Sequence, residues 1–122
     1  MREILFKAKR LDNGEWVEGD LLHTRHADVV LISDFKDQLF RCDGNTLCQY
    51  TGLTDKNGQK IWENDIAYIR SSGLSGYGVI KYENGNLVLV DSKRKRTYSL
   101  YGEWKIRKDG NIFDNADLLE VE

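Results

Sequence analysis

Three features of the sequence predict an all-β protein whose core is a barrel or a sandwich. Asn-Gly pairs at residues 13–14, 57–58 and 84–85 favour tight hairpin turns, because both residue types tolerate positive φ. About eight short segments rich in β-branched and aromatic residues are separated by turn signals of this kind. No window of about eleven residues carries an apolar stripe at the 3.6-residue period of a helix.

The N-terminal segments have the pattern of a small antiparallel β region. Ile4, Phe6 and Ala8 lie on one side of a two-residue alternation, which predicts an opening strand with these three side chains facing the core. The turn at residues 12–14 should then reverse the chain. The expected strands that follow are residues 15–22, the apolar run 27–33 and the alternating segment 38–42.

The C-terminal half contains the clearest hairpin of the chain. Segments 77–82 and 86–90 flank Asn84-Gly85, which predicts two strands joined by a tight turn. Residues 71–78 are rich in glycine and serine, and we expect a flexible connector there. The remaining expected elements are strands at 97–101, 103–106 and 110–113 and a single helical turn at 114–119 that Asp114 caps.

Alternation along the expected strands also predicts which side chains form the core. An apolar residue on the inner face of a strand should be buried, while its neighbours point to the opposite face. The expected buried set is Ile4, Phe6, Trp62, Ile66, Tyr68, Val79, Ile80, Leu87, Leu89, Ile106 and Ile112.

Composition argues against a membrane protein and favours the cytoplasm. The chain has 122 residues, of which 40% are hydrophobic and 31% charged, and its net charge is −2. No apolar run approaches the roughly 18 residues that a membrane span requires. The N-terminus lacks the apolar core and the cleavage site of a secretory signal. We therefore expect a cytoplasmic protein with no membrane partner and with both cysteines reduced.

The most patterned stretch of the chain is QYTGLTDKNGQKIWENDI, residues 49–66. It resembles the signature of the YopX-like proteins, which are small proteins common in phages and prophages of low-GC Gram-positive bacteria. Two positions depart from that pattern: Asn64 replaces a usual glycine, and Ala116 near the C-terminus replaces a usual proline. The resemblance is carried by residues 49–53, 55–58 and 61–66. The structural motif within them consists of Gln49, Tyr50, Thr51, Gly52, Leu53, Asp55, Asn57, Gly58, Glu63, Asn64 and Asp65.

The resemblance implies an architecture in two parts. Residues 1–48 would form the N-terminal β region, and residues 49–122 would form an SH3-like β-barrel. The flanks agree, because the segment from Arg2 to Ala8 resembles the opening strand of the family and residues 110–119 resemble its closing segment. The family implies no cofactor and no particular enzymatic activity.

The chemistry of the patterned stretch suits a structural role better than a catalytic one. Residues 57–58 should close a hairpin, and residues 63–65 should form a turn in which Asn64 takes positive φ. Asp65 should accept hydrogen bonds from nearby backbone N–H groups, as aspartates in turns do. The alternative is a paired-carboxylate catalytic site made of Asp55, Glu63 and Asp65.

Two further kinds of site are possible, a zinc site and a catalytic triad, and neither is favoured. Four side chains of the types that bind zinc are His23, His26, Cys42 and Cys48. Five residues separate the cysteines, which is more than structural zinc sites usually have, and two histidines three apart on a strand point to opposite faces. No nucleophile elbow, phosphate-binding loop or dinucleotide fingerprint occurs. We expect no metal, no cofactor and no enzymatic activity, with a catalytic triad assembled only in space as the alternative.

Positive charge is concentrated in one window of the chain. Residues 93–108 hold seven basic residues and one acidic residue, a net charge of +6, whereas the rest of the chain carries −8. Single-stranded nucleic-acid grooves combine cations for phosphates with aromatic rings for bases. The candidate nucleic-acid-binding residues are Lys93, Arg94, Lys95, Arg96, Tyr98, Tyr101, Trp104, Lys105, Arg107 and Lys108. The alternative is a solvated cationic hairpin whose aromatic rings face the core.

The sequence thus predicts a non-catalytic binding module, with nucleic acid as the first candidate partner, and the resemblance implies a phage or prophage origin. A host or phage protein is the alternative partner, since SH3-like barrels support several functions. The cations at residues 93–96 would also suit the acidic tail of a second copy of the chain, which would drive self-association. The acidic residues concerned are Asp114, Asp117, Glu120 and Glu122.

Overall fold

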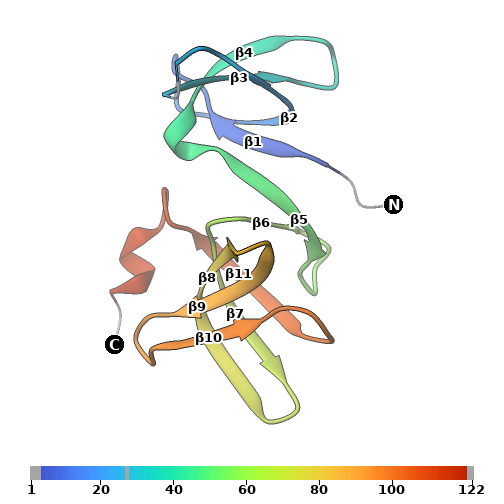
Figure 1. Cartoon of the computed structure of the whole chain (residues 1–122), viewed down its shortest axis with the longest axis vertical. Helices are drawn as coiled ribbons and strands as arrows, with labels where there is room; N and C mark the ends of the chain where they lie inside the picture. The colour runs from blue at the N-terminus through green and yellow to red at the C-terminus, as the bar shows by residue number, and fades with distance from the viewer. Residues whose placement is uncertain (1–3, 27, 121–122) are drawn as a thin grey trace. The chain divides into compact units, whose positions relative to one another are not determined.

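A computed structural model describes residues 4–26 and 28–120 of the chain (Figure 1). Arg2, Ala27 and Glu122, which the sequence analysis placed in strands or in an acidic tail, lie outside the described residues. The described chain is all-β, with eleven strands and two short 3₁₀ helices, so the prediction of an all-β fold is confirmed. The strands form two antiparallel sheets, and the SH3-like barrel stays a prediction. Neither of these helices is long and apolar enough to cross a membrane.

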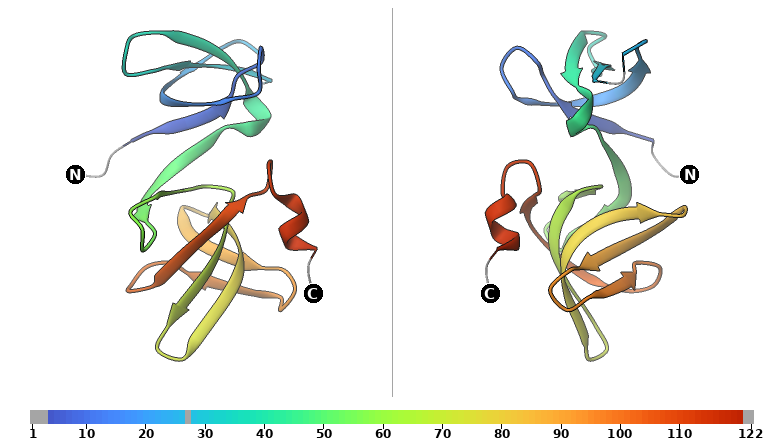
Figure 2. Two further views of the ribbon diagram at one scale, coloured as in Figure 1. Left: turned by 180° about the vertical axis from the view of Figure 1, so that it is seen from behind. Right: turned by 60° about the vertical axis from the view of Figure 1, so that its left-hand side comes forward.

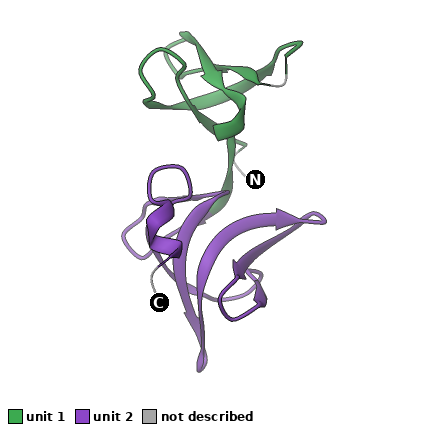
Figure 3. Ribbon diagram, turned by 90° about the vertical axis from the view of Figure 1, so that its left-hand side faces the viewer, with its two compact units in different colours: residues 1–52 green, residues 53–122 purple. Residues whose placement is uncertain are grey.

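The chain forms two compact units (Figure 3). Unit 1 comprises residues 1–52, and unit 2 comprises residues 53–122. The sequence analysis placed the boundary after residue 48, where strand β5 (Cys48–Thr54) begins. The division falls inside β5, which begins in unit 1 and ends in unit 2.

Unit 1 is an antiparallel sheet of short strands with the order β4-β3-β2-β1-β5. The sheet curls, because an isolated bridge joins Arg10 to Cys42 and the Leu11 N–H donates to the Arg41 carbonyl at 2.9 Å. These contacts bring the end of the first strand to the fourth. The elements are β1 (Phe6–Lys9), β2 (Trp16–His23), β3 (Val29–Ser33), β4 (Leu39–Asp43) and the 3₁₀ helix η1 (Gly44–Thr46).

A small apolar core holds unit 1 together, and its centre consists of Ala8, Val30, Ile32 and Cys42. The predicted inner face of the first strand is wrong at its start. Ile4 is 69% exposed and Leu5 is 2% exposed, while Phe6 is only partly buried. The reason is that β1 begins at Phe6, so the alternation of the strand does not extend back to Ile4.

Unit 2 is built on a five-stranded antiparallel sheet with the order β10-β9-β8-β7-β11. Strands β7 to β10 follow one another as a meander, and β11 returns to pair with β7 (Figures 1 and 2). The elements of this unit are β6 (Lys60–Trp62), β7 (Asp65–Ser71), β8 (Leu74–Glu83), β9 (Asn86–Asp91), β10 (Arg96–Ser99), β11 (Lys105–Asn111) and the 3₁₀ helix η2 (Ala116–Leu119).

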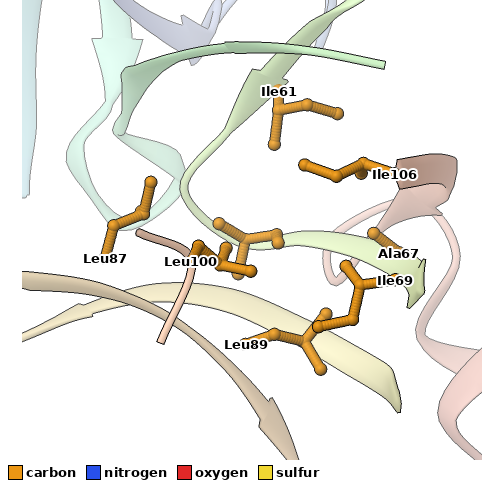
Figure 4. Close-up of a cluster of buried hydrophobic side chains, with 8 residues drawn as sticks. Ile61, Ala67, Ile69, Leu87, Leu89, Leu100 and Ile106 are labelled. Carbon is orange, nitrogen blue, oxygen red and sulfur yellow. The ribbon is translucent and has the colours of Figure 1, made fainter. Parts of the chain in front are cut away.

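The core of unit 2 is formed by apolar side chains from β6, from the inner face of the sheet and from the segment after β10 (Figure 4). Full burial of each large aliphatic side chain stabilises the fold by about 1.5–3 kcal/mol. Partly buried Tyr98 and Trp104 pack against this cluster from outside. The buried residues are Ile61, Ala67, Ile69, Ile80, Leu87, Leu89, Leu100 and Ile106.

Most of the predicted core is confirmed for unit 2. Tyr68 and Ile112 are exceptions, because both are only partly buried. Tyr68 alternates with buried Ala67 and Ile69 and therefore lies on the outer face of β7, while Ile112 follows the last residue of β11. The predicted residues that are buried are Trp62, Ile66, Val79, Ile80, Leu87, Leu89 and Ile106.

The three Asn-Gly turns form as predicted. Gly14, Gly58 and Gly85 have φ values of 74°, 83° and 81°. Asn84 also takes positive φ, at 52°, as a two-residue hairpin turn requires at both of its central positions. The hairpin of β8 and β9 is therefore closed by local sequence chemistry, independently of what packs against it.

Two local predictions are wrong. The segment expected to be a flexible connector is a tight hairpin, because β7 runs to Ser71, β8 starts at Leu74, and Ser72 and Gly73 between them have φ values of 45° and 85°. The helical turn at the C-terminus is not capped by Asp114. Asn115 precedes η2 and makes no side-chain capping hydrogen bond.

The patterned stretch from residue 49 to residue 66 shapes the start of unit 2. The Asp55 Oδ1 accepts the N–H groups of Asn57 and Gln59 at 2.8 and 2.9 Å, which fixes the turn between β5 and β6. Asn64 has a φ of 73°, and the Asp65 Oδ2 accepts the Trp62 N–H at 2.7 Å, so both turn predictions are confirmed. Asp55 and Asp65 are buried and shape the backbone, as the structural interpretation of this stretch predicted.

Candidate nucleic-acid interface

Alternation along two paired strands of unit 2 separates an apolar inner face from a polar outer face. On the inner face, Ile69 of β7 lies opposite Ile106 of β11, and both side chains are buried. The residues next to them in each strand point the other way, because successive side chains of a strand alternate between faces. The outer face of this strand pair therefore carries Tyr68, Arg70, Lys105 and Arg107.

A groove of about 670 Å³ lies over this outer face. The turn between β5 and β6 contributes Lys56, whose backbone N–H donates to the Ile106 carbonyl at 3.3 Å and so ties the turn to β11. Trp104, which immediately precedes β11, also lines the groove. The basic and aromatic lining side chains are Lys56, Tyr68, Arg70, Trp104, Lys105 and Arg107.

The groove is positively charged because four cations line it, against the single lining carboxylate of Asp55. Asp55 is only 8% exposed and caps its own turn. Within residues 4–26 and 28–120, no carboxylate lies within ion-pair distance of Lys56, Arg70 or Lys105. Lys105 and Arg70 also lie directly opposite each other across the strand pair, an arrangement of like charges that destabilises a sheet.

Arg107 differs from these three cations, because it forms an ion pair with Asp109 of the same strand. The register of β11 shifts between Lys108 and Gly110, and at this bulge Asp109 accepts hydrogen bonds from the Arg107 Nε and Nη2 at 2.9 and 3.1 Å. These hydrogen bonds raise the pKa of the Arg107 guanidinium, which also lies 5.0 Å from the ring centroid of Tyr68. Burial raises the pKa of the Tyr77 hydroxyl, and Asp109, to which it is hydrogen-bonded, raises it further.

A second hollow of about 300 Å³ shares Tyr68 with the groove. Lys93 and Arg94, in the turn between β9 and β10, border this hollow together with Tyr77. Asp91 shapes the turn, because its Oδ1 accepts the Arg94 N–H at 3.1 Å and its Oδ2 accepts the Tyr77 N–H at 3.3 Å. The groove and this hollow together form a basic surface on the outer face of the sheet, and we call it the groove surface.

The structure brings half of the predicted nucleic-acid-binding residues to the groove surface. These are Lys93, Arg94, Trp104, Lys105 and Arg107. Lys95, Arg96 and Tyr101 are exposed but line neither hollow. Of the four adjacent cations at residues 93–96, Lys93 and Arg94 thus border the second hollow, while Lys95 and Arg96 are exposed away from it.

The other two predicted residues serve the fold. The Tyr98 hydroxyl donates to the Ser75 carbonyl at 3.1 Å, and the ring packs against the core. Lys108 lies opposite Ala67 on the inner face, where its Nζ is 3.2 Å from the Oδ2 of Asp65, a residue that is 0% exposed. Both side chains are thus engaged in contacts within the fold.

The sequence analysis missed four residues of the groove surface: Lys56, Tyr68, Arg70 and Tyr77. Lys56 and Arg70 lie outside the basic window, so a count of charge along the chain does not find them. Pairing of β11 with β7 brings Arg70 to Lys105, and the hydrogen bond from the Lys56 N–H to the Ile106 carbonyl brings Lys56 to the same groove. The available signal was the alternation in residues 65–71, which places Tyr68 and Arg70 on one face of their strand.

The candidate zinc ligands occupy ordinary structural positions. Cys42 and Cys48 are buried thiols that form no disulfide, and burial raises the pKa of Cys42. The Cys48 Sγ donates to the Thr46 carbonyl at 3.3 Å, while His23 and His26 are exposed. Within the part of the chain that the structure describes, no group of three or more His, Cys, Asp or Glu side chains could hold a metal ion.

Comparisons with known proteins concern the whole chain. Residues 5–120 match the family model described as YopX protein. A search of curated proteins gave no match. Among solved structures, the X-ray crystal structure of protein yopX from Bacillus subtilis is similar, with a TM-score of 0.57 and 16% sequence identity, and the match covers 97% of this chain and 98% of that chain. At this identity the likeness concerns the fold alone.

Proposed function

This chain belongs to the YopX family, and from that premise we propose that it is a non-catalytic accessory protein of phages or prophages that binds nucleic acid through the groove surface. It would act in the cytoplasm of the host cell, where nucleic acid of the phage and of the host is available. The order β10-β9-β8-β7-β11, a meander whose last strand returns beside the first, supports an SH3-like barrel as the scaffold of this surface.

One observation carries the proposal: Lys105 and Arg70 face each other across β11 and β7. Like charges at directly opposed positions of a sheet oppose folding, and no carboxylate among the described residues lies within ion-pair distance of either side chain. Folding therefore gains nothing from this pair. A partner with closely spaced negative charges would turn the repulsion into binding energy, and a phosphate backbone has that spacing.

The proposal is tested by fluorescence anisotropy of labelled oligonucleotides, single- and double-stranded, with the full-length protein. Phosphate contacts release counterions, so the logarithm of the affinity should fall linearly with the logarithm of the salt concentration, by about 0.7 to 0.9 per contact. Absence of binding to either oligonucleotide at tens of micromolar protein in low salt would remove nucleic acid as the partner.

A protein partner is the second candidate, and exposed apolar side chains of unit 1 favour it. Leu11 and Leu39 are 51% and 57% exposed and line one hollow, and Phe35 of the turn before β4 is 74% exposed. Apolar contacts respond weakly to salt, unlike contacts to phosphate. If this patch mediates self-association, Leu39→Ser should abolish a salt-resistant dimer in sedimentation velocity. If the wild-type protein is a monomer at all concentrations, the patch does not mediate self-association, and its partner would have to be a different protein.

A further inference from the structure

Trp104 lines two hollows of unit 2. The groove and a neighbouring hollow of about 400 Å³ share three lining residues: Arg70, Trp104 and Lys105. Trp104 is partly exposed and lines both hollows. The only large rigid ring among these shared residues therefore stands beside two cations that have no ion pair within the described chain.

The orientation of the Trp104 ring is fixed by contacts behind it. Its Nε1–H donates to the Ser99 carbonyl at 3.0 Å, and its ring meets the Tyr98 ring at 76° with 6.0 Å between centroids. Tyr98 is fixed in turn by the hydrogen bond of its hydroxyl to Ser75. It also fills the space over Gly76, where a Cβ atom would come within 2.6 Å of the Tyr98 ring. A ring held in this way loses little entropy when a ligand stacks on it.

From this geometry, and resting on the proposed function, we infer that the groove takes a single strand and that one unpaired base stacks on Trp104. Arg70 and Lys105 then contact the phosphates on either side of that base. In a duplex, both faces of each base are covered by neighbouring base pairs, so a tryptophan in the wall of a groove reaches a base face only in a single strand. Stacking of this kind tolerates every base, because every base has a π face.

The test compares three probes of equal phosphate number on the wild-type protein: an oligo-dT, a chain of abasic sites, and a duplex. Charge alone binds the abasic chain, whereas a stacked base adds roughly fivefold to hundredfold in affinity for oligo-dT. We also expect oligo-dT, and not the abasic chain, to quench tryptophan fluorescence. The signal belongs to Trp104 because Trp62 is 3% exposed and Trp16 lies beneath Lys7 and Lys9.

Variants assign the effect to the two kinds of side chain. Trp104→Leu should bring oligo-dT binding down to that of the abasic chain and remove the quenching, while Arg70→Ser should weaken both probes by the same factor. Equal affinity of wild-type protein for oligo-dT and the abasic chain would overturn base stacking and leave the proposed function standing, and so would a preference for the duplex. Binding to none of the three probes would overturn both. The wild-type comparison decides the matter even if Trp104→Leu does not fold.

Discussion

The two faces of the β7–β11 strand pair have opposite chemistry, although their residues alternate along the same two strands. The inner face buries Ile69 and Ile106 in the core, and the outer face presents Arg70 and Lys105 to the groove. Under the proposed function, neighbouring residues therefore serve stability and recognition separately. A substitution on one face should change the free energy of unfolding, and a substitution on the other face should change affinity.

Lys108 shows that residue type alone does not decide which role a side chain has. Lys105 and Lys108 are both lysines of β11, yet Lys105 lies on the outer face and Lys108 on the inner face. Lys108 there pairs with Asp65, whose carboxylate is fully buried. The strand thus contains one lysine that serves the fold and one that is available to a ligand.

The largest expected effect tests this contrast between the two lysines. Lys108→Met should lower the free energy of unfolding by about 3–5 kcal/mol, because it leaves the Asp65 carboxylate buried without its cation. Lys105→Met is the matched control and should change stability by about 0.5 kcal/mol or less. Urea denaturation measures both. Similar losses in the two variants would contradict the division between faces.

The next effect concerns the core beneath the groove. Ile69→Ala should lower the free energy of unfolding by about 2–5 kcal/mol, since the side chain is 0% exposed and its removal leaves a cavity. Arg70→Ala, the adjacent change on the outer face, should leave the melting temperature nearly unchanged. Calorimetry of the two variants side by side gives the comparison, and an unchanged melting temperature for Ile69→Ala would show that the inner face is misplaced.

A smaller effect is expected in the turn between β9 and β10. Changing Lys93, Arg94, Lys95 and Arg96 together to serine should weaken oligonucleotide binding several-fold and to the same extent for every sequence, because phosphate contacts position rather than specify. The melting temperature should stay unchanged. Asp91 shapes the turn by accepting hydrogen bonds from backbone N–H groups, and the serine variant keeps these groups. A loss that depends on base sequence would contradict a purely electrostatic role for these residues.

The smallest expected effect is a gain in affinity for oligonucleotides. Asp109→Asn removes a negative charge beside the groove and releases the Arg107 guanidinium, which Asp109 now holds through two hydrogen bonds. Affinity for oligonucleotides should rise by about two- to fivefold, in line with one additional charge contact at moderate salt. Anisotropy titrations at one fixed salt concentration suffice. Weaker binding by this variant would show that the Arg107–Asp109 pair is part of the binding surface rather than a competitor for it.

Much of the fold could be predicted because its signals are local. An Asn-Gly pair closes a hairpin wherever it occurs, so Gly14, Gly58 and Gly85 were placed correctly. The resemblance carried by residues 49–66 is likewise confirmed by the family match over residues 5–120. The prediction for the start of the first strand was wrong. Pairing with β2 and β5 begins at Phe6, and only that pairing decides which side chains face inward.

The groove surface could be predicted only in part, because pairing between distant strands assembles it. The basic window included Lys105 and Arg107, which lie in one strand. Arg70 precedes them by more than thirty residues and joins them only through the register of β11 with β7. The same register turns Lys108 inward, although its charge made it look like a surface residue. Charge along a sequence thus suggests which kind of partner to test, while register decides which charges lie on the same face of the sheet.

The central claim is that the groove cations bind nucleic acid without contributing to folding, and one double variant tests it most directly. Arg70→Ser combined with Lys105→Ser should lower the salt slope of single-strand binding by about 1.4 and weaken binding at low salt by about tenfold or more. The melting temperature should not fall, because the two substitutions also remove the repulsion between the opposed cations. The matched control, Lys36→Ser with Lys81→Ser, removes the same charge from exposed positions that do not line the groove and should keep the wild-type slope. Equal slopes and affinities for the two double variants would contradict the claim.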